Sequence, residues 1–386
     1  MSTEDPPARA DAVVIGAGPG GLAVAAQLRR AGFTPVVLDR ALEVGSSWAA
    51  HYDRLHLHTA RTLSSLPGLP IPREYGRWVA RDDFRRYLSD YAAHHRLDLR
   101  LGVTVTGVSQ GDDGWRVGWR SAASAGTVET PIVVVATGYN HEARMPSWPG
   151  LAEYRGRVIH SSEYRNPAEL AAHSVLVVGP GNSGGEIAAD LAEAGVRVQL
   201  AVRTPPNIVR RQVAGIPGQV LVLSISPLPT PAGDRVARLV QRLSVGDLTR
   251  FGLPPAPRGI VTQMERDDVT PTIDVGLLAA LRRGAVTVVP AVASFTTDAV
   301  VLVDGTEVRP DVVIAATGFA RGLEPIVGEL RVLAPSGRPL INAAAQLAGL
   351  GGLYFLGYSN PLTGNIRQLA IDARAIARHA GRRSAR

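Results

Sequence analysis

Residues 12–39 read AVVIGAGPGGLAVAAQLRRAGFTPVVLD, and this stretch decides the fold of the N-terminal part of the chain. A short apolar run ends at Ile15, the glycine-rich turn 16–21 follows, and a helical apolar pattern then continues to Gly32. Residues 35–38 predict a second strand, which ends at Asp39. Strand, GxGxxG, helix, strand and acid come in the order of a Rossmann dinucleotide-binding unit. The free amides and partial positive charge of the helix N-terminus would hold the phosphates.

The same pattern recurs in the middle of the chain. Residues 174–178 predict a strand, residues 179–184 read GPGNSG, and a helix is expected from Gly185 to about Ala194, before a strand over residues 196–202. In both turns the first glycine permits the tight turn, the second lets the backbone approach a pyrophosphate, and the last lets helix and strand pack closely. The sequence therefore predicts two dinucleotide sites.

The residue at the end of the second strand differs in charge between the two units. It lies 23 residues after the first glycine in one unit and 24 in the other, so Asp39 and Arg203 occupy equivalent positions. A carboxylate would accept hydrogen bonds from a ribose diol and repel a 2′-phosphate, which a guanidinium binds in a bidentate fork. We predict FAD at the first site and NADPH, rather than NADH, at the second. For Arg210 and Arg211 two interpretations stay open, a contribution to phosphate binding or a solvated basic turn.

The composition excludes several classes of protein. The chain has 386 residues, 45% of them hydrophobic and 19% charged, which suits a globular protein with a large core. It contains no cysteine and no lysine, which excludes disulfide reductases with a redox cysteine pair, cysteine-ligated metals and Schiff-base chemistry. The arginines behind the net charge of +7 are scattered among acids, so no nucleic-acid partner is expected.

The length of the apolar runs and the N-terminal residues bear on the location of the protein. The runs are shorter than the roughly 20 residues of a membrane span, and the polar, acidic start of the chain does not resemble a signal peptide. We expect a cytoplasmic protein with no membrane span, with a homodimer as an open possibility for its assembly.

The order of the patterns predicts an α/β fold of two Rossmann-like domains of the three-layer ββα type. We expect residues 1–168 and 319–386 to form a discontinuous FAD-binding domain and residues 169–318 an NADPH-binding domain. An insertion at about 204–270, with a helix expected over residues 234–243, would be either a cap over a substrate pocket or an oligomer surface. Alternating apolar residues predict a β-meander around Trp115, Val117 and Trp119, and a final helix is expected over residues 365–379.

Between the two glycine motifs, residues 154–164 read YRGRVIHSSEY. Together with both motifs, this stretch resembles the fingerprint of the flavin-containing monooxygenase family. Residues 48–58, the proline-rich stretch 66–72, the GPGNSG motif followed by Glu186, and residues 352–357 are similar to the YUCCA branch of that family. The resemblance covers nearly the whole chain.

The resemblance implies a mechanism. NADPH would reduce FAD, oxygen would add to the flavin as a C4a-hydroperoxide, and one oxygen atom would pass to a small substrate. In residues 55–61, LHLHTAR, His58 occupies a position at which many members of the family have asparagine. The YUCCA branch also has histidine at this position. Ala60 replaces a proline of the same family pattern. Tyr164 is followed by Arg-Asn-Pro rather than ending in Trp-Pro, which argues against a typical Baeyer–Villiger enzyme.

We predict catalytic roles for His58 and Arg61, the first toward the oxygenated flavin or substrate and the second toward an acidic substrate. The alternatives are a satisfied polar face for His58 and a surface or phosphate contact for Arg61. His160 is expected to join the domains or contact NADP⁺, and no metal is expected. The predicted cofactor-binding residues are Gly16, Gly18, Pro19, Gly20, Gly21, Asp39, Arg40, Trp48, Val105, Thr137, Gly138, His160, Gly179, Gly181, Asn182, Ser183, Gly184, Arg203, Thr317, Gly318, Asn360 and Thr363.

The functional hypothesis is a monooxygenase that uses FAD and NADPH to insert one atom of O₂ into a 2-oxo acid, a carbonyl compound, or a sulfur or nitrogen nucleophile. One alternative is a flavin-dependent NADPH oxidase or reductase that passes electrons to a quinone, a partner or oxygen. Another is a nucleotide-sensing protein without catalysis. All three share the predicted cofactor sites and differ in the fate of the electrons that NADPH carries.

Overall fold

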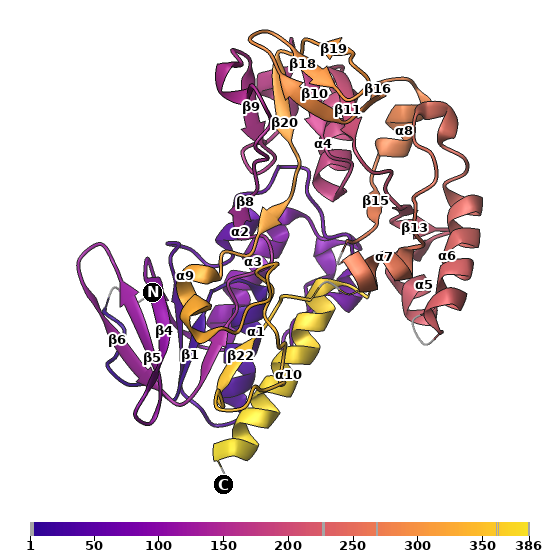
Figure 1. Cartoon of the computed structure of the whole chain (residues 1–386). Helices are drawn as coiled ribbons and strands as arrows, with labels where there is room; N and C mark the ends of the chain where they lie inside the picture. Colours follow the sequence, from indigo (N-terminus) through magenta and orange to yellow (C-terminus); the bar gives the residue numbers. More distant parts are fainter. Residues whose placement is uncertain (1–3, 226–227, 268, 360, 362, 385–386) are drawn as a thin grey trace. The chain divides into compact units, whose positions relative to one another are not determined.

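The computed structural model describes residues 4–225, 228–267, 269–359, 361 and 363–384. The chain forms two compact units, one of residues 1–50, 60–142 and 319–386, and the other of residues 51–59 and 143–318 (Figure 1). Among the described residues, no helix is long and apolar enough to cross a membrane.

The first unit contains the N-terminal glycine motif and the C-terminal helix. Its strands and α-helices are β1 (Ala12–Ile15), α1 (Pro19–Arg30), β2 (Pro35–Asp39), α2 (Ser46–Ala49), α3 (Arg81–His94), β3 (Asp98–Leu101), β4 (Thr104–Gly111), β5 (Gly114–Arg120), β6 (Ala125–Thr130), β7 (Val133–Val135), β21 (Phe319–Ala320), α9 (Glu324–Val327), β22 (Leu353–Phe355) and α10 (Asn365–Ser384).

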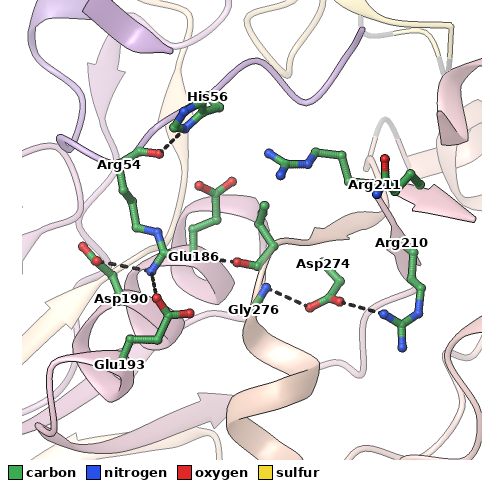
Figure 2. Close-up of a pocket in the computed structure, with 11 residues that line it drawn as sticks. Arg54, His56, Glu186, Asp190, Glu193, Arg210, Arg211, Asp274 and Gly276 are labelled. Carbon is green, nitrogen blue, oxygen red and sulfur yellow. Dashed lines mark hydrogen bonds and ion pairs between the residues drawn. The ribbon is translucent and has the colours of Figure 1, made fainter. Parts of the chain in front are cut away.

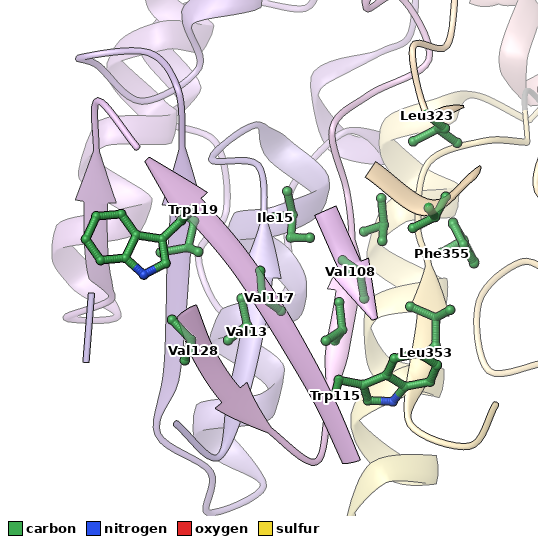
Figure 3. Packing of buried hydrophobic residues seen from close by; sticks show 14 of the residues in the cluster. Val13, Ile15, Val108, Trp115, Val117, Trp119, Val128, Leu323, Leu353 and Phe355 are labelled. Carbon is green, nitrogen blue, oxygen red and sulfur yellow. The ribbon is translucent and has the colours of Figure 1, made fainter. Parts of the chain in front are cut away.

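The core of the first unit is a parallel sheet in the order β22-β7-β1-β2-β3. Its central strands are buried along their whole length, as expected of strands covered on both faces. Helix α1 contacts β1, β2 and α10. The antiparallel sheet β4-β5-β6 supplies a further layer, and Figure 3 shows the side chains of β5 packed against those of β1. The predicted three-layer architecture is confirmed.

The β-meander is as predicted, but the strand before it is not continuous. Trp115, Val117 and Trp119 all point into the core from β5. Residues 98–111 form two strands, β3 and β4, because Gly102 adopts a φ of +73° and turns the chain between them. A left-handed φ of this kind is open to glycine and interrupts a sheet ladder.

The second unit contains the central glycine motif. Its strands and α-helices are β9 (Arg157–His160), β10 (Ser174–Val178), α4 (Asn182–Glu193), β11 (Arg197–Val202), β12 (Ile208–Arg210), β13 (Gln212–Val213), β14 (Ile216–Pro217), α5 (Gly218–Ile225), α6 (Thr230–Ser244), α7 (Ile260–Asp267), β15 (Thr272–Asp274), α8 (Leu277–Arg282), β16 (Val286–Pro290), β17 (Val292–Phe295), β18 (Val300–Leu302), β19 (Glu307–Val308) and β20 (Val312–Ala315). Strand β8 (Glu142–Ala143) spans the point in the chain where one unit ends and the other begins.

Four of the five strands in the parallel sheet of the second unit repeat the order of the first, and the fifth differs, because β9 comes before the glycine motif whereas β22 comes after it. Its parallel sheet runs β16-β11-β10-β20-β9, and an antiparallel sheet, β17-β18-β19, lies between β16 and β20 in the chain. In both sheets the strand before the glycine motif is central, with the next strand on one side and a later strand on the other. Ligands of such sheets bind at the carboxyl ends of the strands where the order reverses. Each glycine motif lies at that point in its own sheet.

The segment predicted as an insertion interrupts the second unit after β11. It carries α5, α6 and α7, and the helix expected over residues 234–243 is the longer α6. The apolar run at residues 220–223 lies in helix α5. A short apolar run does not by its composition distinguish a strand from a buried helix.

Candidate functional site: two dinucleotide cradles and a charged cavity

In the first unit the glycine motif leaves no room for side chains at two positions and open space at a third. A Cβ atom at Gly16, whose φ is +112°, would lie 2.5 Å from the carbonyl oxygen of Ala136, and one at Gly21 would lie 1.8 Å from the carbonyl oxygen of Gly16. At Gly18 no heavy atom lies within 4 Å of such a Cβ. The turn is therefore packed against the sheet at its ends, and its middle is open to the close approach of a ligand.

The second unit repeats this geometry. A Cβ atom at Gly179, whose φ is +108°, would lie 2.5 Å from the carbonyl oxygen of Ala316, and one at Gly184 would lie 1.9 Å from that of Gly179. Gly181 has open space around it. Two turns with the same steric requirements at the same three places fit two pyrophosphates, each at the N-terminus of a helix.

The turn of the second unit is also held by hydrogen bonds. The side chain of Asn182 accepts a hydrogen bond from the Ile273 amide at 2.7 Å and donates one to the Pro271 carbonyl at 3.4 Å. The hydroxyl of Thr272 donates to the Pro180 carbonyl at 2.7 Å. Strand β15 thus fixes the turn, and the Asn182 side chain has a structural role in addition to the predicted one.

The residues at the ends of β2 and β11 differ in their surroundings as well as in charge. Asp39 accepts hydrogen bonds from the amides of Ala17, at 2.6 Å, and Ala41, at 2.8 Å. A carboxylate has about four acceptor positions, so capacity remains for a ribose diol. Arg203 is exposed and has no hydrogen bond or ion pair within the described part of the chain. Its guanidinium is therefore accessible to a phosphate group.

Several other predicted cofactor residues lie in the first unit. The amide of Thr137, which follows β7 and precedes Gly138, donates to the Tyr358 hydroxyl at 3.2 Å, and the Thr137 hydroxyl lies 2.9 Å from the same oxygen. Burial raises the pKa of Tyr358 to about 12, so this hydroxyl stays protonated. Trp48 packs edge-on against Phe84, with ring centroids 4.6 Å apart.

The remaining predicted residues of this unit have ordinary environments. Pro19 is the first residue of α1, and Gly20 follows it. Arg40 is exposed, and Val105 packs against the core from β4. Thr363 precedes α10 by two residues, and Asn360 lies outside the described residues.

His160, at the end of β9, is buried in the second unit. Its Nε2 lies 3.0 Å from the carbonyl oxygen of Gly318, and its Nδ1 accepts from the Ser162 amide at 3.1 Å. These partners suit a neutral ring, and burial lowers the pKa of His160. The neighbouring Thr317 donates to the Arg144 carbonyl. The bonds of His160 join β9 to the chain after β20.

The two predicted catalytic residues belong to different units. His58 donates from Nε2 to the carboxylate of Glu186, which is 3% exposed. The Tyr52 hydroxyl also bonds to Glu186, and burial, followed by the charge of Glu186, raises the pKa of Tyr52 well above its usual value. Arg61 donates to the carbonyls of Ile71 and Gly76, both at 3.0 Å. These bonds give Arg61 a role in holding its own loop.

A cavity of about 550 Å³ lies within the second unit, beside the carboxylate of Glu186. Figure 2 shows its lining, with Arg211 and His56 facing one another across it. Arg210 bonds to the Ser244 carbonyl and lies 3.9 Å from Asp274. Burial lowers the pKa of Arg211, and the charge of the nearby Glu186 opposes this shift. Many small-molecule sites have this volume but an apolar lining, so this cavity suits a polar or charged ligand.

The sequence patterns did not identify the acidic face of α4 that meets residues 51–59. Glu186, Asp190 and Glu193 lie on one side of this helix. Arg54 donates to Asp190 at 3.2 Å and to Glu193 at 3.0 Å. Two signals in the sequence could have identified this face. The acids of α4 are spaced by four and three residues, and residues 52–58 contain an unusual concentration of Tyr, Arg and His.

Comparisons with known proteins agree with this geometry. Residues 13–214 match the family described as pyridine nucleotide-disulphide oxidoreductase. Indole-3-pyruvate monooxygenase YUCCA1 of Oryza sativa subsp. japonica is 36% identical over 311 residues, 80% of this chain and 76% of that protein. Probable indole-3-pyruvate monooxygenase YUCCA3 of Arabidopsis thaliana is 30% identical, over 95% of this chain and 85% of that protein. A flavin-containing monooxygenase from Stenotrophomonas maltophilia has a similar structure, with a TM-score of 0.76, 26% identity, and coverage of 97% of this chain and 99% of that one.

Proposed function

The chain belongs to the flavin monooxygenase family, and on that premise we propose that it uses FAD and NADPH to insert one oxygen atom of O₂ into a small organic substrate. One observation carries the proposal, the pair of turns with matching steric requirements, one followed by Asp39 and the other by Arg203. The family model that matches residues 13–214 is described as a pyridine nucleotide-disulphide oxidoreductase. The absence of cysteine excludes dithiol chemistry in this chain.

Each cradle would hold its own cofactor. In the first unit the open backbone at Gly18 would face the pyrophosphate of FAD, and Asp39 would accept from a ribose hydroxyl. In the second unit Gly181 would face the pyrophosphate of NADPH, and the exposed guanidinium of Arg203 would bind its 2′-phosphate. The bound nicotinamide supplies a hydride, and the reduced flavin activates oxygen.

The remaining predicted residues would act on the substrate or on the geometry of the site. We assign His58 a hydrogen bond to the reacting groups, because its ring is held by Glu186 and its side chain retains 20% exposure. Arg61 would bind an acidic substrate only with the donors that its bonds to two backbone carbonyls leave available. The second unit would contribute the charged cavity between α4 and Arg211.

The substrate class rests on the relatives. The plant proteins named above are indole-3-pyruvate monooxygenases, which favours a 2-oxo acid here. Carbonyl compounds and sulfur or nitrogen nucleophiles belong in the same screen.

The experiment is an oxygen-labelling screen with purified holoenzyme. NADPH consumption, peroxide release and product mass are measured under ¹⁸O₂ with 2-oxo acids, ketones, thioethers and amines in turn. The proposal predicts one substrate class for which consumption rises, peroxide falls and the product gains one ¹⁸O atom. If every compound leaves NADPH consumption matched by peroxide, the protein is an NADPH oxidase. Absence of any turnover of NADPH would support a nucleotide-sensing protein instead.

A further inference from the structure

Glu186 is a buried carboxylate in the first turns of α4, two residues after the last glycine of the turn. It is 3% exposed, and it bonds to two side chains of residues 51–59. The ring Nε2 of His58 and the hydroxyl of Tyr52 are those partners. A carboxylate removed from water is costly unless donors compensate it, so these two bonds are what this position requires.

Residues 51–59 also contact the rest of the second unit at two further points. Arg54 bonds to Asp190 and Glu193, and donates to the Val275 carbonyl at 3.3 Å. Asp53 accepts from the Asn166 side chain at 2.7 Å. The segment is therefore held by contacts that do not involve Glu186, and a change at Glu186 leaves those contacts in place.

The bond between Glu186 and His58 fixes which ring nitrogen carries the proton. A carboxylate accepts hydrogen bonds, so Nε2 of a neutral His58 must be the protonated nitrogen. In the described part of the chain Nδ1 of His58 has no hydrogen bond, and the side chain is 20% exposed. Nδ1 is then the ring atom left to accept a hydrogen bond from a ligand.

We propose that Glu186 is a positioning residue that holds His58 as the Nε2-protonated tautomer, which leaves Nδ1 to accept a hydrogen bond from a ligand. Tyr52 supports this arrangement because its hydroxyl donates to the same carboxylate. The role of His58 in the reaction rests on the proposed function. The tautomer of His58 does not, because it can be measured in the protein when no reaction takes place. A carboxylate that sets the tautomer and orientation of a functional histidine is a common arrangement in enzyme sites.

The test compares Glu186→Gln with Asp190→Asn, a matched acid-to-amide change on the same face of α4. Side-chain ¹⁵N–¹H correlation spectra of ¹⁵N-histidine protein report the tautomer of each ring, and the His58 signal is identified by its loss in His58→Asn. We expect the Nε2-protonated pattern in the wild type and in Asp190→Asn. In Glu186→Gln an amide can donate as well as accept, so the pattern should shift toward protonation at Nδ1.

The spectrum and the kinetics fail in distinguishable ways. A wild-type His58 protonated at Nδ1, or a spectrum unchanged in Glu186→Gln, overturns the inference whether or not the protein oxygenates any compound. If the Gln variant does not fold, the wild-type spectrum still decides. With a substrate from the screen, Glu186→Gln should lower kcat about 10- to 150-fold, the equivalent of one hydrogen bond to a charged group. It should lower kcat no further in the His58→Asn background, and additive losses would show that Glu186 does not act through His58.

Discussion

Substitution of Gly181 by alanine should separate NADPH binding from folding. A Cβ at this position meets no heavy atom within 4 Å, and the φ of −68° is one that alanine adopts readily. Gly181 is also the N-cap of α4, where exchange of glycine for alanine costs about 1 kcal/mol or less. The new methyl group would project into the space that a pyrophosphate needs. We expect folding and FAD content close to the wild type, and a clear loss of NADPH affinity.

The loss can be given a magnitude. Displacing the pyrophosphate from the turn removes at least one charge-assisted hydrogen bond, worth about 1.5–3 kcal/mol. The KM for NADPH, or the Kd of NADP⁺ by calorimetry, should therefore rise about 10- to 150-fold. The flavin spectrum and the unfolding midpoint are measured on the same sample, to show that the effect is confined to the second site.

Gly184→Ala is the matched control, because the same methyl group there has no space. It would lie 1.9 Å from the Gly179 carbonyl oxygen, well inside the 3.0 Å that real Cβ contacts keep. Backbone must move, and overpacking of this kind costs about 1–3 kcal/mol or more. We expect a lower unfolding midpoint for this variant alone. Unchanged NADPH affinity in Gly181→Ala would refute the placement of the pyrophosphate at this turn.

Substitutions at three other positions probe the FAD cradle, the 2′-phosphate contact and a buried histidine. Gly18→Ala should lower FAD content and leave the Kd of NADP⁺ unchanged, and retention of a full complement of flavin would count against the first cradle. Arg203→Glu should raise the KM for NADPH about 10- to 150-fold and leave FAD content intact, with Arg203→Gln intermediate; equal KM values would remove the 2′-phosphate assignment. Burial lowers the pKa of His160, so below the ordinary value of about 6.5 the unfolded chain takes up a proton that the folded chain does not. Stability should therefore fall as the pH drops below that value, less steeply in His160→Gln, and an equal loss of stability with pH in both proteins would contradict this cause.

The part of the fold that the sequence predicts depends on short-range rules. Gly16 and Gly179 each adopt a positive φ that glycine tolerates more readily than other residues. The periodicity of the flanking strands and helices is likewise visible within a few residues. The meander around Trp115 follows from alternation along one strand. Local patterns of this type are visible without knowledge of the tertiary structure.

The part that the sequence does not predict depends on contacts between distant residues. His56 and His58 alternate with leucines and suggest one face of an extended strand, yet His56 bonds to the Arg54 carbonyl and His58 to Glu186, 128 residues away. Nothing in residues 51–59 alone specifies that helix. The bonds of Arg61 to two carbonyls likewise arise from the path of its loop. The roles of these residues, and the domain boundaries near 168 and 318, stay predictions.

The proposed chemistry requires that one chain hold two different dinucleotides at once. Native mass spectrometry of the purified protein, with and without added NADP⁺, measures this directly. We expect one FAD per chain in the first spectrum and one FAD plus one NADP⁺ in the second, with no comparable adduct from NAD⁺. A chain that gains NADP⁺ only as it loses FAD, or that never carries more than a single dinucleotide, would contradict the proposal.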